Sequence, residues 1–219
     1  MSEFRADWQR WGATKAIYAR ILIRLERYLG VHIFLINSRP LNPETDAAVL
    51  PDGHSVRYLE PSDIDVIDAN PELQLSAASI QAALERGDIC IGYFDESALV
   101  SYFWCGFSTV PMERGLWVQV PPREYSYAYK ALTLESHRGH RLQNVLTQAN
   151  DALLTRRGFK FNIEYIAPHN FAQRAASARY GNRTMGIAGY ISLFGRVVSF
   201  RSPAIKKLKF RFFAAHPQP

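Results

Sequence analysis

The sequence predicts an α/β (α+β) fold: a mixed, mainly antiparallel twisted sheet, flanked by helices and preceded by an N-terminal helical extension. The first supporting observation is a strand, a turn, a long helix and a second strand within residues 125–165. The second is two pairs of apolar runs, 89–94 with 99–107 and 185–194 with 197–200, separated by short turns typical of β-hairpins. The third is an apolar pattern of helical period in residues 17–29.

Bulk composition indicates a globular protein with a substantial core. The chain has 219 residues, 47% hydrophobic and 21% charged, which is ordinary for a globular domain. No apolar run is long enough to span a bilayer, and Glu3 and Asp7 make a secretory signal unexpected. With only two cysteines, Cys90 and Cys105, a disulfide framework is not expected. We therefore expect a cytoplasmic protein, and the spacing of the His, Cys, Asp and Glu residues predicts no metal site.

The formal net charge of +6 is unevenly distributed along the chain. Six Lys and Arg residues and no acidic residue follow position 195, and the rest of the chain balances at 20 basic against 20 acidic residues. The sequence thus assigns the positive excess to the C-terminal tail. This distribution predicts no general nucleic-acid-binding face.

Residues 1–53 are expected to form an amphipathic helix, a short strand and a linker. The helix ends at Gly30, and its apolar face comprises Ile17, Tyr18, Ile21, Leu22, Leu25, Tyr28 and Leu29. A β-branched run at 31–36 predicts a buried strand, and the prolines of 37–53 predict a linker. The favoured interpretation is that the helix packs against the main domain or against a second copy in a homodimer. The alternative is contact with an anionic membrane surface.

The main domain is expected at residues 54–200, and its first half combines strands with two short helices. Alternating apolar residues predict a strand at 55–59, and a proline with acidic neighbours at 60–63 predicts a helix start. A second helix is expected at 77–86, followed by the hairpin strands 89–94 and 99–107. Residues 109–122 are expected to form a loop.

The second half of this domain is organised around the long helix. A strand is expected at 125–134, and apolar residues at helical spacing predict a helix at 139–157 that stops at Gly158. A returning strand at 161–166, a helix at 171–180 and the hairpin 185–200 complete the domain.

A basic turn separates the central strand from the long helix. The first amides of a helix have no partner within it, and the helix dipole places partial positive charge there, so such an end favours phosphate groups. Arg138 and Arg141 add full charges beside these amides. We therefore expect a phosphate-bearing ligand at residues 138–143, and the alternative is a solvated basic turn.

The order of elements over residues 55–200, together with this turn, resembles the GNAT acyltransferase superfamily. That family carries Gln/Arg-x-x-Gly-x-Gly/Ala between its fourth strand and third helix, and the matching run here is Arg138-Gly-His-Arg-Leu-Gln143. The opening arginine and Gly139 agree, but Arg141 and Gln143 replace the two later small residues. Asn170 is similar to the asparagine that opens the family's fourth helix, and Gly181 falls where a glycine is expected after it.

The resemblance implies a coenzyme A-dependent N-acyltransferase that transfers an acyl group from acetyl-CoA, or from another acyl-CoA, to a small-molecule or peptide amine. In the family, the backbone of the fourth strand holds the pantetheine arm and polarises the thioester carbonyl. The implied cofactor-binding residues are Thr133, Leu134, Arg138, Gly139, His140, Arg141, Leu142, Gln143 and Asn170.

Candidate acid and base groups also follow from the resemblance. The tyrosine of the fourth helix that protonates the leaving sulfur corresponds by register to Ser177, and nearby Tyr180 is a rival candidate. Glu135 is the carboxylate nearest in sequence to the expected thioester and is the candidate base. Glu164, on the returning strand, is a weaker alternative.

Three tyrosines, Tyr125, Tyr127 and Tyr129, share one face of the central strand. Tyr127 stands where some family members have a glutamate base. The three side chains are expected either to line the acceptor pocket as substrate-binding residues or to pack in the core.

Residues 201–219 form a basic aromatic tail, in which Leu208, Phe210 and Phe212 alternate with basic residues. The tail is expected to add a strand to the fold or to bind an acidic protein or anionic lipid. Two alternative functions remain open for the whole chain. One is a non-catalytic GNAT-fold module that binds coenzyme A or a partner, and the other is a membrane-peripheral acyltransferase that acts on a lipid or cell-envelope precursor.

Overall fold

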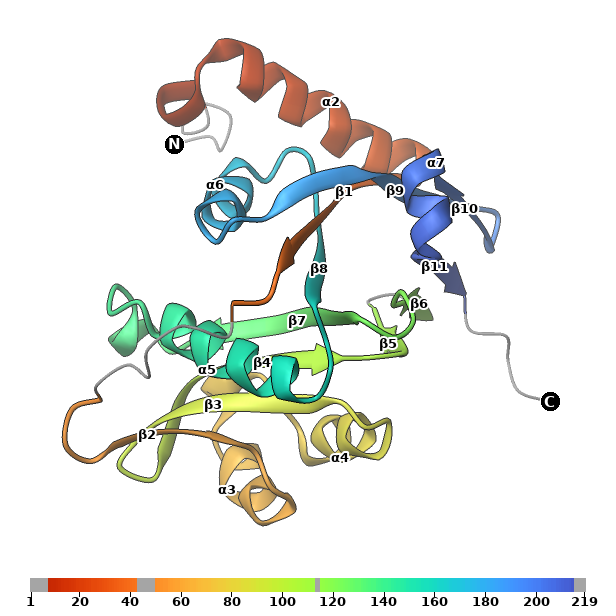
Figure 1. Ribbon diagram of the computed structural model, residues 1–219. Helices are drawn as coiled ribbons and strands as arrows, with labels where there is room; N and C mark the ends of the chain where they lie inside the picture. Colours follow the sequence, from red (N-terminus) through yellow and green to blue (C-terminus); the bar gives the residue numbers. More distant parts are fainter. Residues whose placement is uncertain (1–7, 43–49, 113–114, 215–219) are drawn as a thin grey trace. The chain divides into compact units, whose positions relative to one another are not determined.

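The computed structural model describes residues 8–42, 50–112 and 115–214, and the chain divides into two compact units (Figure 1). Unit 1 comprises Met1–Arg39, Ser108–Pro121 and Ile163–Pro219, and unit 2 comprises Pro40–Phe107 and Pro122–Asn162. Each unit therefore joins stretches that are far apart in the sequence.

The sheet of unit 2 contains β2 (His54–Tyr58), β3 (Ile89–Asp95), β4 (Ala98–Gly106) and β7 (Tyr125–Thr133). These strands follow the order β7-β4-β3-β2, and each neighbouring pair is antiparallel. The predicted hairpin strands and the predicted central strand are confirmed to within one or two residues. The mixed α/β class with a mainly antiparallel sheet is also confirmed.

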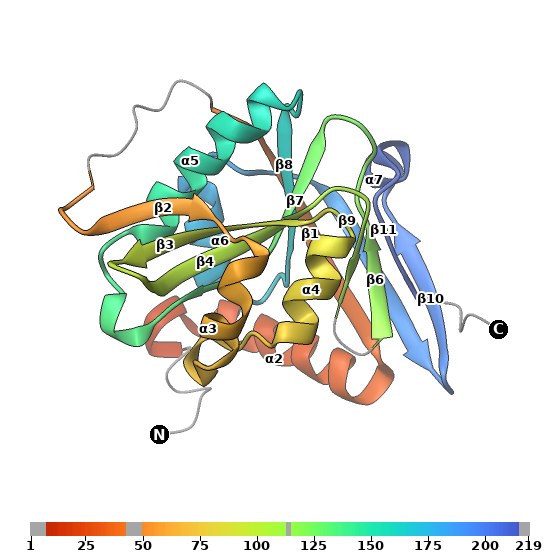
Figure 2. The same ribbon diagram turned by 90° about the horizontal axis from the view of Figure 1, so that it is seen from below.

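Helices cover both faces of this sheet (Figures 1 and 2). The long helix α5 (Leu142–Arg156) packs on one face, where Leu146 and Leu154 meet Phe103 and Cys105 in a buried cluster. The short helices η1 (Pro61–Asp63), α3 (Ile64–Asp68), η2 (Pro71–Leu73) and α4 (Ala77–Glu85) lie toward the other face. There Ile80 packs with Tyr102 and Trp104. Successive residues of β4 therefore point to opposite faces of the sheet, so that alternate residues belong to the two clusters.

A β-bulge interrupts β7 where it pairs with β4. Tyr129 is opposite Trp104 and Leu132 is opposite Tyr102, so two residues of β7 face the single residue Phe103. Lys130 has a φ of 45° in this bulge. Lys130 and Ala131 are exposed, whereas Ser126 and Tyr127 earlier in the strand are buried. The bulge thus opens the end of β7 that leads to α5.

Unit 1 contains a second set of paired strands. β9 (Arg183–Leu193) lies antiparallel between β1 (Val31–Pro40) and β10 (Arg196–Arg201), and β8 (Phe161–Ile166) lies next to β1. A small separate sheet has the order β11-β6-β5, from Arg211–Ala214, Leu116–Gln119 and Thr109–Pro111. The helices of this unit are α2 (Ala13–Leu29), α6 (Phe171–Arg179) and α7 (Pro203–Leu208).

Three segments differ from the expectation. The strand predicted at 31–36 continues to Pro40 as a paired strand, the predicted loop 109–122 contains β5 and β6, and the predicted tail contains α7 and β11. The strands within 109–122 were not predicted, because Pro111, Pro121 and Pro122 argue against strands and the alternating pattern of β6 is only four residues long. Residues 43–49 of the expected linker and 215–219 of the expected tail lie outside the described residues.

Gly30 joins α2 to β1 and is confirmed as the helix terminator. Its φ is 60°, and a Cβ at this position would lie 2.1 Å from the carbonyl oxygen of Ser192. The amide of Ser192 donates to the carbonyl of Gly30 at 2.9 Å. A glycine is therefore required here both by the backbone conformation and by the close approach of β9.

Aromatic side chains from distant segments form the core of unit 1. Phe212 of β11 is fully buried, and its ring centroid lies 5.1 Å from Phe34, 5.3 Å from Tyr165 and 5.9 Å from Tyr190. Phe210 is also fully buried and meets Phe212 edge-on at 5.4 Å. These residues of the tail therefore belong to the packed interior.

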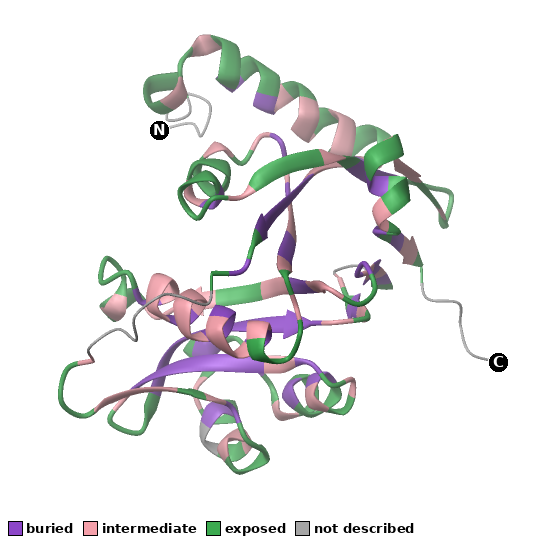
Figure 3. Cartoon of the chain, viewed as in Figure 1, coloured by how far each residue is buried: buried purple, intermediate pink, exposed green. Residues whose placement is uncertain are grey.

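The helix α2 is buried most deeply outside the expected apolar face, of which only Leu22 and Leu25 are half-buried. Ala16 and Ala19 are its buried residues, whereas Ile17, Ile21 and Tyr28 are exposed (Figure 3). The prediction that the apolar face packs against the main domain is therefore wrong for these side chains, because two alanines allow the side of the helix that carries them to approach closely. Among the described helices, none has the length and apolar character needed to cross a bilayer.

Candidate functional site

The turn that enters α5 presents a row of unpaired backbone amides. Gly139 has a φ of 88° and Arg141, which caps the helix, has a φ of 58°. Within the described residues, the amides of Gly139 to Gln143 donate no hydrogen bond to another group. Successive amides in such a conformation converge into an anion-binding concavity at the positive end of the helix dipole. This geometry can hold a phosphate or diphosphate.

Basic side chains surround these amides. Arg138, His140 and Arg141 are all exposed. The Nε of Arg138 donates to the carbonyl of Thr133 at 3.3 Å, so its guanidinium lies between the end of β7 and the start of α5. His140 Nδ1 lies 3.3 Å from the carbonyl oxygen of His137. Both the charge and the amides expected from the sequence are therefore present at one turn.

Two residues of the expected set face inward. Leu142 is buried in the core of unit 2. Gln143 Nε2 lies 2.9 Å from Ser101 Oγ, 3.0 Å from each of the carbonyl oxygens of Tyr102 and Leu132, and 3.3 Å from Thr133 Oγ1. The side chain of Gln143 thus ties α5 to β4 and β7, and only its backbone amide faces the turn. The sequence pattern did not indicate this role.

The end of β7 offers one free backbone edge. The amide of Leu134 donates to the carbonyl of Val100 at 2.9 Å, and the carbonyl of Leu134 accepts from the amide of His137 at 2.9 Å. Because successive residues direct their backbone groups to opposite edges of a strand, the amide of Thr133 points away from β4. Of the two residues expected to hold a pantetheine arm, Thr133 therefore directs its amide away from β4 while its carbonyl accepts from Arg138, whereas both backbone groups of Leu134 are engaged within the fold.

The candidate base Glu135 begins the short helix η4 (Glu135–His137) and is exposed. His137, in the same helix, is held by two neighbours. Its Nδ1 lies 2.8 Å from Ser136 Oγ, and its Nε2 lies 3.3 Å from the carboxylate of Asp95. Glu135 thus stands in solvent beside the basic turn, while His137 is drawn toward β3.

The tyrosine stripe of β7 lies largely in the interior of unit 2. Tyr127 is 5% exposed and stacks on Tyr129 at 5.9 Å. The hydroxyl of Tyr129 donates to Asp88 Oδ2 at 2.8 Å, and Asp88 also pairs with Arg86 at 2.8 Å. Tyr125 stacks on Phe161 at 5.1 Å. These contacts match the interpretation of the three tyrosines as core residues.

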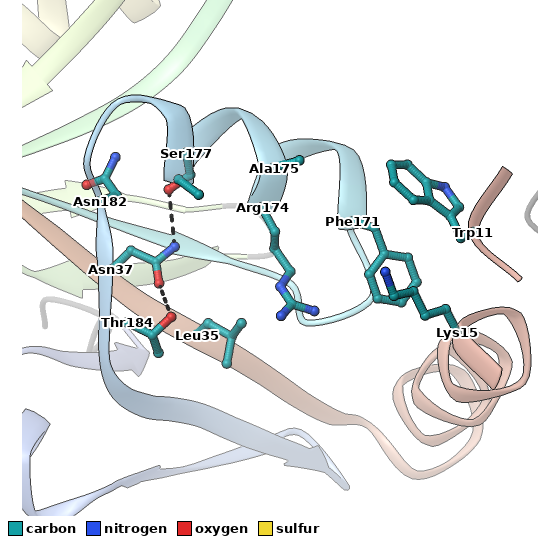
Figure 4. Close-up of a pocket in the computed structure, with 11 residues that line it drawn as sticks. Trp11, Lys15, Leu35, Asn37, Phe171, Arg174, Ala175, Ser177, Asn182 and Thr184 are labelled. Atoms are coloured by element: carbon teal, nitrogen blue, oxygen red, sulfur yellow. Dashed lines mark hydrogen bonds between the residues drawn. The ribbon is translucent and has the colours of Figure 1, made fainter.

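In unit 1, the candidate acid Ser177 belongs to a buried polar chain. Ser177, on α6, is 3% exposed, and its hydroxyl donates to the carboxylate of Glu164 on β8. Asn37 Nδ2 donates to Ser177 Oγ at 3.3 Å, and Thr184 Oγ1 donates to Asn37 Oδ1 at 2.9 Å (Figure 4). The rival candidate Tyr180 is exposed at the end of α6. Asn37 is not among the predicted site residues, because the prolines of 37–53 predict a linker there.

Burial raises the pKa of Glu164 above its ordinary value, although hydrogen bonds from Ser177 and Asn37 and the charge of Arg39 oppose this shift. The protonated form is therefore favoured by the folded state more than by the unfolded chain. A carboxyl of this kind stabilises the fold below its unfolded pKa, and that contribution is lost as the pH rises through the folded pKa.

Replacing Glu164 with glutamine should remove this pH dependence. We expect the unfolding free energy of Glu164→Gln, relative to the wild type, to increase between about pH 4 and pH 8, because only the wild type must ionise a buried carboxyl. Ser177→Ala should lose more unfolding free energy than the wild type as the pH rises, since it removes a hydrogen-bond donor to the carboxylate of Glu164. Denaturant titrations at several pH values measure both effects. A difference in unfolding free energy between Glu164→Gln and the wild type that does not vary with pH would contradict this account.

A pocket of about 340 Å³ borders this polar chain within unit 1 (Figure 4). Its lining includes Trp11 and Phe171, whose ring centroids are 5.8 Å apart. Lys15 Nζ lies 5.5 Å and the Arg174 guanidinium carbon 5.7 Å from the centre of the Phe171 ring. Two cations on one aromatic ring suit a ligand with an anionic group.

Asn170 caps α6. Its Oδ1 accepts from the amide of Gln173 at 3.0 Å, which occupies this side-chain oxygen. Gly181 has a φ of 82° just after the helix, so its position matches the expected helix stop. Cys90 and Cys105 are both buried and unbridged, and the described part of the chain contains no cluster of three or more His, Cys, Asp and Glu side chains arranged for a metal ion.

Comparison with solved structures decides the fold. The chain aligns with a GNAT-family protein from Novosphingobium aromaticivorans at a TM-score of 0.50 and 13% identity, over 74% of this chain and 63% of that one. It aligns with a tandem GNAT protein of the clavulanic acid biosynthesis pathway at a TM-score of 0.52 and 16% identity, over 82% of this chain and 57% of that one. The chain has the GNAT fold.

No family model matches the chain, and no curated protein matches it. The chain spans less than two thirds of the length of either GNAT protein named above. The resemblance found in Arg138–Gln143 and in the order of elements is thus confirmed at the level of the fold.

Proposed function

We propose that this GNAT-fold protein is an acyl-CoA-dependent N-acyltransferase. The acyl donor is acetyl-CoA, or another acyl-CoA, and the acceptor is an amine of a small molecule or peptide in the cytoplasm. The main support is the row of unpaired amides at Gly139–Gln143, at the start of α5, together with the side chains of Arg138 and Arg141. This anion site occupies the position of the family's diphosphate-binding signature.

In this proposal, the amides of residues 139–143 bind the diphosphate of coenzyme A, and the two arginines add charge-assisted contacts. The exposed, bulged end of β7 accepts the pantetheine arm, with the amide of Thr133 as its donor. The same donor can stabilise negative charge on the thioester oxygen during attack. Leu142, Gln143 and Leu134 support the site through the core and through backbone contacts.

Acyl-CoA supplies an activated thioester. The amine nitrogen forms a bond to the acyl carbon as the carbon–sulfur bond breaks, the amine loses a proton, and the thiolate gains one. Glu135, exposed beside the basic turn, is our candidate for accepting the amine proton. Ser177 and Tyr180 remain the candidates for protonating the sulfur. The hydroxyl of Ser177 donates to the carboxylate of Glu164, whose pKa is raised by burial.

Ligand stabilisation and thiol release test this proposal. Acetyl-CoA at a hundred times its Kd should stabilise the folded protein by about 2.7 kcal/mol, because it binds only the folded state. With a panel of primary amines, the protein should release free coenzyme A thiol in an amine-dependent manner. The absence of any shift in melting temperature at saturating acetyl-CoA would exclude the proposed function.

One observation favours a non-catalytic coenzyme A-binding module as the second candidate. The family's later small positions are replaced by Arg141 and by the anchored Gln143, and Tyr127 stands where some members have a carboxylate. Such a module would show the shift in melting temperature without thiol release for any amine. The two experiments together therefore distinguish the enzyme from the inert binder.

A further inference from the structure

Unit 1 exposes a cluster of large apolar side chains at one corner. Phe194, at the turn between β9 and β10, is 95% exposed. Leu193 beside it, Val198 on β10, and Tyr28 and Leu29 at the end of α2 are each more than half exposed. We call these five residues the apolar corner. Exposed apolar side chains that gather at one place on a protein often mark a binding surface.

The five residues are neighbours although they come from two ends of the chain. The carbonyl of Gly30, directly after Leu29, accepts from the amide of Ser192, directly before Leu193, at 2.9 Å. Val31 is opposite Ile191 in the β1–β9 pair, and Val198 is opposite Ile191 in the β10–β9 pair. Backbone hydrogen bonds and strand pairing thus join the end of α2 to the tip of the hairpin. Figures 1 and 2 both show the end of α2 close to this hairpin.

The outer stripe of α2 extends the apolar corner. Ile17, Ile21 and Tyr28 are exposed, and their spacing places them within about 40° of one another around the helix axis. Arg24, also exposed, lies on the same stripe. An outward stripe of apolar residues with arginines among them is the pattern of a helix that lies in a membrane interface.

The two units carry opposite charge. Unit 1 has 17 Lys and Arg residues against 5 Asp and Glu residues, a formal net charge of +12, whereas unit 2 has 9 against 15, a net charge of −6. The positive excess therefore belongs to the whole of unit 1 and not to the tail alone, which corrects the expectation from the linear sequence. Around the apolar corner, Arg24, Arg27 and Arg196 are exposed, and the nearby Glu26 is paired with His32 at 3.2 Å.

We propose that unit 1 docks on an anionic lipid bilayer, with Phe194, Leu193 and the outer stripe of α2 inserted among the headgroups. Exposed apolar side chains supply the insertion, and the net charge of +12 supplies attraction to anionic lipid. This inference is independent of the proposed acyl transfer, because it uses no residue of the coenzyme A site.

Two other occupants fit the surface less well. A second copy related by two-fold symmetry would gather Arg24, Arg27 and Arg196 of both copies at one contact, which concentrates like charges there. A nucleic acid would match the charge but would leave the aliphatic side chains of Leu29, Leu193 and Val198 without a suitable surface. A bilayer satisfies both the charge and the apolar residues.

Co-sedimentation with vesicles tests this proposal on the full-length protein. The wild type should bind vesicles of equimolar phosphatidylcholine and phosphatidylglycerol, bind phosphatidylcholine vesicles weakly, and dissociate as salt is raised. Phe194→Ser should weaken partitioning about tenfold, because one large apolar side chain no longer enters the interface. Arg24→Gln with Arg27→Gln should weaken binding to anionic vesicles about tenfold or more.

Matched controls separate docking from folding and from general charge. Met185→Ser changes an exposed apolar residue at the far end of β9, about 30 Å along the strand from Phe194, and should bind as the wild type does. Arg156→Gln with Arg157→Gln removes the same charge from unit 2. Phe194→Ser should retain the wild-type melting temperature, since the side chain is exposed.

Three outcomes would overturn the proposal. The first is wild-type vesicle binding by Phe194→Ser. The second is a dimer in light scattering that Phe194→Ser dissociates, with no binding to vesicles. The third is salt-sensitive binding to RNA or DNA with no binding to vesicles. Failure of acetyl-CoA to bind would leave this result unaffected, so the two proposals can fail separately.

Discussion

The Phe212→Ala variant is expected to lose about 3–5 kcal/mol of unfolding free energy. Phe212 is fully buried, and its ring meets Phe34, Tyr165, Tyr190 and Phe210, which come from β1, β8, β9 and the segment before β11. Its truncation would leave a cavity bounded by side chains from several strands, and these cannot all relax into it. Urea denaturation followed by tryptophan fluorescence measures the change.

Phe213→Ala is the matched control for this prediction. Phe213 is the next residue of β11, is only half-buried, and has the guanidinium of Arg211 over its ring at 5.1 Å. Its removal should cost much less, about 1 kcal/mol, because partly exposed apolar area contributes less to stability. A loss in Phe212→Ala as small as the one expected for Phe213→Ala would contradict the assignment of Phe212 to the core of unit 1.

The double charge reversal Arg138→Glu with Arg141→Glu is expected to weaken coenzyme A binding about a hundredfold or more. Each arginine is assigned a charge-assisted contact of about 1.5–3 kcal/mol with phosphate, and each glutamate would repel it. Acidic residues in the first turn of a helix interact favourably with its dipole. The variant should therefore fold at least as stably as the wild type, so loss of binding cannot be attributed to unfolding.

The control for this variant is Arg156→Glu with Arg157→Glu at the other end of α5. Both arginines are exposed, and the change in net charge is identical. Acidic residues at a helix C-terminus oppose the dipole, so this control should be slightly less stable while binding coenzyme A normally. Isothermal titration calorimetry and thermal melts measure the two properties. Equal loss of affinity in both variants would mean that only the overall charge matters.

Much of the fold of unit 2 was predictable because its signals are local. The hairpin of β3 and β4 is marked by continuous apolar runs about a short polar turn, and β7 and α5 each occur close to their predicted bounds. Unit 1 was less predictable because its pairings are distant in sequence. β1 lies between β8 and β9, and β11 pairs with β6. The sequence pattern of a single strand does not indicate which distant strand it pairs with.

In the candidate site too, the features with local sequence signals were predictable, and the features that depend on distant contacts were not. The free amides and the basic side chains of residues 138–143 follow from a strand–turn–helix pattern and the chemistry of helix ends. The inward orientation of Gln143, the engagement of both backbone groups of Leu134, and the link between Asn37 and Ser177 depend on tertiary contacts. For α2, the pattern correctly located the apolar residues, but the deepest burial falls at two alanines outside the predicted face.

The most direct test of the central claim is an amide NMR titration of the protein with coenzyme A. The account predicts that the backbone amides of Gly139, His140, Arg141, Leu142 and Gln143 show the largest chemical-shift changes, together with Thr133 on β7. It also predicts that dephosphorylated pantetheine leaves the five turn amides unchanged. Large shifts confined to other segments, with these amides unmoved at saturating coenzyme A, would contradict the assignment of the diphosphate to the start of α5.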